Sequence, residues 1–295
     1  MKRLKIITSL LIVIAAFCAI SCASDVEYKN PLTAEQLTEF LSGKKYGTEL
    51  PYGYKFSFEY ERTDYITDNI KNDLAGQKIQ TTASVSGLIY NDENVLPSDP
   101  SILQKNITYL KYSGKYKCHV TTPSVYGTSK ESITQNESAV YVGDKLYLAY
   151  KCSESNSGGS LTTSGKTAST SVSKLYDFIK NYFFSTSTDL IFHTKNTVFP
   201  AQYLSITSSY PITECLTNYM TDNSTFDYVF TQGSSLILMQ SRASFEKTFM
   251  YTFSGNRNTG LKITYNSARE NYVMTLKYTS DVPDLKPPKN AELYK

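Results

Sequence analysis

The segment YKFSFEYE, residues 54–61, shows the two-residue alternation of aromatic and polar residues on which the predicted fold rests. Its aromatic residues Tyr54, Phe56, Phe58 and Tyr60 alternate with polar or charged residues. Successive side chains of a β-strand point to opposite faces of the sheet. The alternation therefore predicts a strand with one buried face and one solvent-facing face.

Similar alternating or apolar runs recur along the chain and predict about a dozen strands in all. They cover residues 79–90, 107–112, 116–120, 139–142, 146–150, 190–193, 203–207, 226–230, 236–240, 245–253, 261–265 and 272–278. Short turn signals separate several of them, at Ser113 with Gly114, at Gly143 with Asp144 and at Gln232 with Gly233. Connections this short join only antiparallel neighbours.

Two amphipathic helices are predicted beside these strands. Thr33 and Gln36 have the spacing of a capping box, and Gly43 is placed to end the first helix. Apolar residues at helical spacing predict a second helix over residues 172–184. Between the strands and this second helix, residues 153–173 are rich in Ser, Thr and Gly, which predicts a flexible loop.

The predicted fold class is mainly β, of the α+β type. A long open sheet tends to curl, and its apolar face must be covered. We therefore expect a strongly curved antiparallel sheet or half-barrel of about a dozen strands, covered by two or more helices. Residues 32–295 are expected to form this single β-rich domain, without an internal repeat.

The N-terminus has the pattern of an exported lipoprotein. A basic start precedes an apolar run over residues 6–20, which predicts a signal peptide over residues 1–21. Ala19, Ile20 and Ser21 before Cys22 resemble a lipobox, so Cys22 is the predicted lipidation site and residues 22–31 the tether. The alternative is ordinary cleavage near the same point, which would release a soluble exported protein.

The charge balance of the sequence argues against a nucleic-acid partner. The chain has 30 basic and 27 acidic residues, and the signal peptide contains Lys2, Arg3 and Lys5. Its removal leaves equal numbers, and no run of basic residues stands out along the sequence. We expect the partners to be a membrane, through lipidated Cys22, and a lipid or another hydrophobic ligand.

The sequence contains no recognisable catalytic or metal-binding motif. Its two histidines, His119 and His193, both lie in predicted strands, where a structural role is the more common one. Gly159, Gly165 and Lys166 look like a phosphate loop, but five residues separate the glycines instead of four. We therefore expect a protein that is not an enzyme and has no cofactor.

Cysteine usage leaves the redox state open. Beyond Cys22, the residues Cys118, Cys152 and Cys215 permit one disulfide in three pairings and leave one thiol over.

The chain resembles the periplasmic lipoprotein-carrier superfamily, which includes the LolA, LolB and LppX-like proteins. The resemblance lies in the element order: an early helix, a long meander, a helical insertion and a second meander. Locally, residues 115–117 and 139–147, with the turn Gly143–Asp144, are similar to the strand pairs of such a meander. The resemblance implies a half-open β-barrel, closed on one side by helices, with a lipid-binding cavity between them.

These observations lead to one functional expectation and one alternative. We expect an exported, lipid-anchored lipoprotein of the bacterial cell envelope that faces the periplasm or the cell surface. It is expected to bind a lipid or another hydrophobic ligand in a half-barrel cavity without catalysing a reaction. The alternative is a surface interaction or structural lipoprotein in which the aromatic residues form ordinary core. The candidate ligand-lining residues are Tyr54, Phe56, Phe58, Tyr60, Phe249, Tyr251 and Phe253.

Overall fold

The computed structural model describes residues 31–46, 53–65, 76–91, 107–124, 127–169, 210–221, 224–279 and 281–295. Residues Leu32–Lys295 form one compact unit. Several predictions lie outside the described residues: the signal peptide, Cys22, most of the tether, the helix over residues 172–184, the strands at 190–193 and 203–207, and His193.

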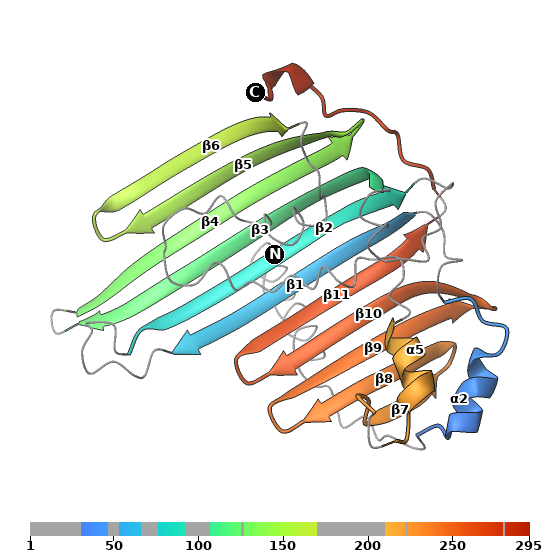
Figure 1. Ribbon diagram of the computed structural model, residues 1–295. Coiled ribbons are helices and arrows are strands. Elements are labelled where there is room, and N and C mark those ends of the chain that lie inside the picture. Colours follow the sequence, from blue (N-terminus) through green and yellow to red (C-terminus); the bar gives the residue numbers. More distant parts are fainter. Residues whose placement is uncertain are drawn as a thin grey trace, which may run out of the picture. The chain divides into compact units, whose positions relative to one another are not determined.

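Eleven antiparallel strands form one curved, unclosed sheet (Figure 1). The strands are β1 (Gly53–Tyr65), β2 (Lys78–Asn91), β3 (Ile107–Ser124), β4 (Gly127–Val142), β5 (Lys145–Asn156), β6 (Gly159–Ser169), β7 (Tyr228–Gln232), β8 (Ser235–Arg242), β9 (Phe245–Ser254), β10 (Arg257–Ser267) and β11 (Glu270–Thr279). Their order is β6-β5-β4-β3-β2-β1-β11-β10-β9-β8-β7. The mainly β class is confirmed, and the strand number is close to the predicted dozen.

The two faces of the sheet differ in chemistry. We call the face that carries Phe56 and the side chains in register with it the apolar face, and the face that carries Lys55 the polar face. On the apolar face, Phe56 lies opposite Leu276, which lies opposite Leu261, which in turn lies opposite Tyr251. All four are at most 3% exposed. Burial of each such side chain contributes about 1.5–3 kcal/mol, so the register of the strands is strongly specified.

The first helix forms as the sequence predicts. Helix α2 (Ala34–Leu41) begins after Thr33, whose hydroxyl accepts from the Gln36 backbone N–H while the Gln36 side chain accepts from the Thr33 backbone N–H. Its Leu37 and Leu41 are buried, and the Phe40 ring packs edge-on against Phe253 of β9 at 5.8 Å. Helix α2 therefore covers part of the apolar face.

A second described helix, α5 (Tyr210–Asn218), was not predicted. Its Ile212 and Cys215 are fully buried in the same core as α2 and the apolar face. Figure 1 shows α2 and α5 beside strands β7 to β9. The described helices thus lie at one end of the strand order.

Two local predictions are wrong. Ser113 and Gly114, predicted as a hairpin turn, lie in the middle of the continuous strand β3. Residues 153–169 were predicted as part of a flexible loop, but they complete β5 and form β6. Most side chains of β6 are exposed, so backbone pairing with β5 defines it without an apolar pattern.

The C-terminal segment reaches the outer edge of β6. The Ala168 N–H donates to the Lys295 carbonyl at 3.2 Å, and the Lys295 N–H donates to the Lys166 carbonyl at 3.4 Å. The Tyr294 ring packs edge-on against Tyr147 of β5 at 5.6 Å. The end of the chain therefore covers part of an edge strand that would otherwise present free backbone groups.

Candidate functional site

The candidate ligand-lining residues all lie on the apolar face. Tyr54, Phe56, Phe58 and Tyr60 are 2%, 3%, 2% and 4% exposed, and Phe249, Tyr251 and Phe253 are 3%, 0% and 3% exposed. β11 and β10 separate the two groups and carry Met274, Leu276, Leu261 and Ile263 at the positions between them. The structure therefore joins all seven residues into one continuous apolar band.

A polar network interrupts the apolar face on β3 and β4. The Tyr112 hydroxyl donates to Oε1 of Glu137 at 3.0 Å, and Nε2 of Gln135 donates to Oε2 of the same carboxylate at 3.2 Å. All three side chains are buried. Burial, together with the adjacent Glu137 carboxylate, raises the pKa of Tyr112 well above its usual range. This hydroxyl therefore stays protonated and can donate.

Sequence reasoning missed this network, although a signal was present. Gln135 and Glu137 alternate with exposed Asn136 and Ser138. They occupy the inward-facing positions between Ile133 and Ala139. A buried carboxylate is costly unless it is hydrogen-bonded, so the polar residues at these inward-facing positions predict a buried hydrogen-bond network.

A charged cluster lies at one end of the same face. Arg62 donates from Nε to Oδ2 of Asp64 at 2.6 Å and from a terminal nitrogen to Oδ1 at 3.0 Å. Glu270 lies 3.7 Å from the other terminal nitrogen of Arg62. Burial raises the pKa of Glu270, and burial beside Glu270 raises the pKa of Tyr60 to about 12. On β1, the cluster follows directly after Tyr60, the last of the four alternating aromatic residues.

Cys118, Cys152 and Cys215 are free and buried. Burial raises the pKa of each thiol, and that of Cys215 reaches about 12 because Glu214 adds its negative charge. These thiols are therefore poor nucleophiles. Within the described ranges, no group of His, Cys, Asp and Glu side chains is arranged to hold a metal ion.

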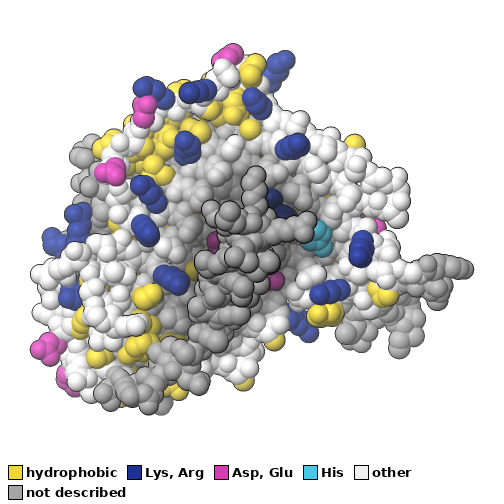
Figure 2. Space-filling view, turned by 180° about the vertical axis from the view of Figure 1, so that it is seen from behind, with side chains coloured by type: hydrophobic (Ala, Val, Ile, Leu, Met, Phe, Trp, Pro, Cys, Tyr) yellow, Lys and Arg dark blue, Asp and Glu magenta, His cyan; other side chains and the backbone are white. Residues whose placement is uncertain are grey.

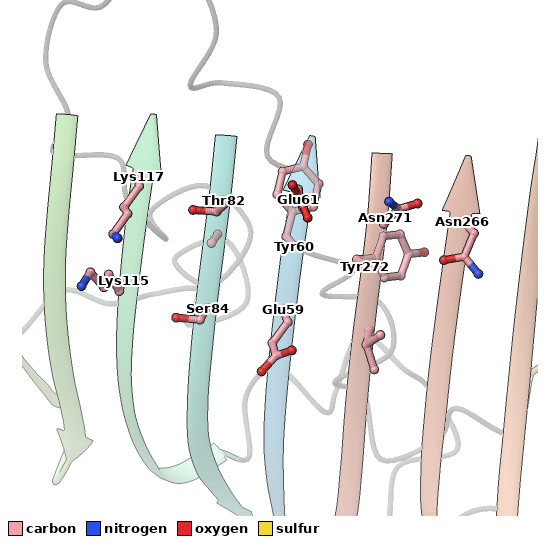
Figure 3. A pocket seen from close by; sticks show the side chains of 12 residues that line it. Glu59, Tyr60, Glu61, Thr82, Ser84, Lys115, Lys117, Asn266, Asn271 and Tyr272 are labelled. Atoms are coloured by element: carbon pink, nitrogen blue, oxygen red, sulfur yellow. The ribbon is translucent and has the colours of Figure 1, made fainter. Parts of the chain in front are cut away.

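The polar face has shallow depressions lined by both hydrophilic and apolar side chains. Figure 3 shows one of about 450 Å³, where Glu59 and Glu61 of β1 lie beside side chains of the neighbouring strands. The other labelled hydrophilic side chains are Thr82, Ser84, Lys115, Lys117, Asn266 and Asn271.

Basic side chains predominate on the polar face. Its lysines are Lys55, Lys78, Lys111, Lys115, Lys117, Lys130, Lys145, Lys151, Lys166, Lys262 and Lys277. Among the described strand residues on this face, the acidic ones are Glu59, Glu61 and Glu246. Figure 2, seen from behind relative to Figure 1, shows Lys and Arg side chains at many places on the described part of the face turned toward the viewer. Folding thus gathers lysines that are dispersed along the sequence.

Comparison with known proteins adds little. No family model matches the chain, and no curated protein is significantly similar to it. A porin-like protein from Bacteroides uniformis is 10% identical, over 79% of this chain and 97% of that chain, with a TM-score of 0.15. A score this low supports no conclusion about fold or function. The described residues include no helix long and apolar enough to cross a membrane.

Proposed function

We propose that this chain is an exported, lipid-anchored lipoprotein that binds a lipid or another hydrophobic ligand along the apolar face of a half-barrel, without chemistry. The observation that carries the proposal is the continuous apolar band on an unclosed sheet. The seven candidate side chains are at most 4% exposed, so a ligand would bind by taking the place of the groups packed against them, and apolar contact would contribute about 25 cal/mol per Å² buried. The proposed anchor rests on Cys22 and its lipobox-like context, and it would hold the protein at a membrane of the bacterial cell envelope.

The order of the described elements supports the likeness to the lipoprotein-carrier superfamily. Helix α2 precedes a six-stranded meander, β1 to β6. Helix α5 follows, and then a five-stranded meander, β7 to β11. The first and last strands pair to join the two meanders into one sheet. This order parallels the helix, meander, helical insertion and meander of the resemblance, with α5 between the two meanders; the helix predicted over residues 172–184 lies outside the described residues.

The polar network gives the proposed ligand site a hydrophilic end. Tyr112, Gln135 and Glu137 sit within otherwise apolar surroundings on β3 and β4. An amphiphilic ligand needs apolar contacts for its chains and a few placed polar groups for its head. The Tyr112 hydroxyl donates to Glu137, which keeps this carboxylate hydrogen-bonded beside an apolar ring.

The first test is native mass spectrometry of the mature chain carrying Cys22→Ser, purified from a lipid-containing host and then extracted with solvent. A stoichiometric hydrophobic adduct is expected. A clean apo mass that also fails to take up added phospholipids or fatty acids would contradict the proposal and favour a surface interaction lipoprotein.

A substitution on β2 separates a ligand cavity from a filled core. Ala83 lies on the apolar face between Tyr60 and Tyr116 and is 6% exposed. If ligand volume lies above it, Ala83→Phe should abolish the adduct while leaving the thermal midpoint nearly unchanged. In a filled core, the added ring would instead cost about 1–3 kcal/mol of stability. Ser84→Phe, one residue along on the exposed polar face, is the matched control and should retain the adduct.

A further inference from the structure

Small side chains in register form a row across the middle of the polar face. The row starts at Thr275 of β11 and continues through Ser57, Ser86, Ser113, Ser138 and Ala149. Lys262 of β10 lies at one end and Lys166 of β6 at the other. We call these side chains the hydroxyl row. With neighbouring strands about 4.8 Å apart, the row spans roughly 34 Å between its terminal lysines.

The hydroxyl row is the floor of a continuous groove. Three depressions overlap along it, and Ser113 lines all three. Its four serines are exposed. On β1, β3, β4 and β5 the residues two positions away along the strand have larger side chains and form the walls. The groove therefore runs across the strands, and its floor bears hydroxyl groups.

Lysines stand on both walls of this groove. Lys277, Lys55 and Lys111 belong to one adjacent row, and Lys115 and Lys151 to the other. On β3, Lys111 and Lys115 flank Ser113, each about 7 Å from it along the strand. Among the described residues, none of these lysines forms an ion pair, and the carboxylate that shares the walls is Glu59.

The arrangement of lysines is unfavourable without an anionic partner. Lys55 lies directly opposite Lys277 on the neighbouring strand. Like charges at such paired positions destabilise a sheet. An anion between them would replace this repulsion with attraction on both sides.

One end of the groove also carries aromatic rings. Tyr147 and Tyr294 pack edge-on at 5.6 Å, and Nζ of Lys145 and Lys166 lies 5.3 Å and 5.4 Å from the respective ring centres. Because Tyr147 is buried, the rings hold the two ammonium groups at this end of the groove, and these ammonium groups suit a neighbouring acid group.

We propose that this groove binds an extended acidic polysaccharide, a second activity separate from hydrophobic ligand binding on the opposite face. Such a polymer repeats carboxylates or sulfates for the lysines and hydroxyl groups for the serine floor. Single-stranded nucleic acid fits less well, because it is held by aromatic side chains that stack successive bases. The described aromatic rings here lie at one end of the groove.

The test measures binding of oligogalacturonate and of neutral dextran to the mature chain with Cys22→Ser, by calorimetry over a range of salt concentrations. Oligogalacturonate should bind, with affinity falling as salt screens the lysines, and dextran should not. The double variant Lys111→Gln/Lys115→Gln should weaken binding about tenfold, since two exposed charge contacts are lost.

A matched double variant provides the control. Lys78→Gln/Lys130→Gln removes the same charge from the same face away from the groove and should change the affinity less than twofold. Ser113→Phe should block the groove floor, whereas Ser155→Phe on the same face should not. Equal losses in both double variants would overturn the proposal, because they would indicate binding to general positive charge. Equal or tighter binding of an oligothymidylate or of anionic phospholipid vesicles at the same lysines would also overturn it.

Discussion

Replacing Gly87 by alanine should destabilise the sheet at a position where two strands have no spare room. Gly87 lies on the apolar face of β2, opposite Phe56 and Tyr112. A Cβ there would lie 2.4 Å from the Lys111 carbonyl oxygen and 2.7 Å from two atoms of the Phe56 ring. The carbonyl belongs to the backbone of β3, which is paired on both sides, so it cannot move alone.

The size of the effect follows from two opposing terms. Overpacking a tight core position costs about 1–3 kcal/mol, whereas the loss of glycine's freedom in the unfolded chain offsets about 0.4–1 kcal/mol. The difference between the two terms spans roughly 0–2.6 kcal/mol and centres near about 1.3 kcal/mol, which lowers the melting temperature of a domain this large by roughly 3–5 °C. Urea titration and thermal unfolding, both followed by circular dichroism, measure it.

Gly165 is the control within the same chain. A Cβ at Gly165 would lie 2.6 Å from the Tyr150 ring, a clash as close as that with Phe56. Tyr150 is only half-buried, and β6 is an edge strand, so its ring can turn aside. Gly165→Ala should therefore cost less than Gly87→Ala. An equal or larger cost would refute the reasoning that backbone confinement decides the outcome.

Further predictions concern the polar network, the thiols, the charged cluster and the C-terminus. Tyr112→Phe removes a hydrogen bond to the buried Glu137 carboxylate and should cost about 1.5–3 kcal/mol in urea titration. A change below about 0.5 kcal/mol, the usual range of surface substitutions, would contradict this expectation. The thiol of Cys215, buried and with its pKa raised, should not react with a thiol reagent at pH 8 until the chain unfolds. Burial raises the pKa of Glu270, so the folded chain binds the proton of this carboxyl group more tightly than the unfolded chain does. The free energy of unfolding should therefore fall as pH rises from 4.5 through the raised pKa. Glu270→Gln should flatten this part of the curve of stability against pH. Deletion of residues 288–295 uncovers the edge of β6, so light scattering should detect dimers whose fraction rises with protein concentration. A monomer at every concentration would show that the C-terminal segment is not what protects this edge.

The sequence allowed much of the sheet to be predicted because burial imposes a period of two. β1, β8, β9 and β11 carry clear apolar alternation or apolar runs, and each was expected close to its observed place. The α2 cap was equally readable, since Thr33 and Gln36 act over four neighbouring residues. Where a local or periodic pattern determines the structure, the prediction succeeded.

The misses have different physical causes. β6 has almost no buried side chain, so its pairing with β5 leaves no mark on the hydrophobic pattern. Ser113 and Gly114 look like a turn, but neighbours on both sides hold them in an extended strand. Helix α5 contains Pro211 and two threonines, which are poor helix residues, and the burial of Ile212 and Cys215 stabilises it.

The candidate sites likewise divide into residues that a periodic pattern identifies and residues that only strand pairing brings together. The aromatic residues of the apolar band were identified from their alternation. The Tyr112, Gln135 and Glu137 network needed the register of β3 against β4, which the sequence does not state. The lysine groove was missed for a stronger reason: its residues come from different strands and never form a basic run, so only the pairing of the strands brings them together.

The pairing of β1 with β11 has a consequence for how the chain folds. Every other neighbouring pair in the sheet is consecutive in sequence, so the two meanders can each form from nearby residues. The β1–β11 ladder instead brings Gly53 beside Thr279, and each doubling of a closed loop adds about 0.6 kcal/mol of entropy cost. This ladder should therefore form late, after two separately structured halves exist. Folding would then be limited by the docking of those halves.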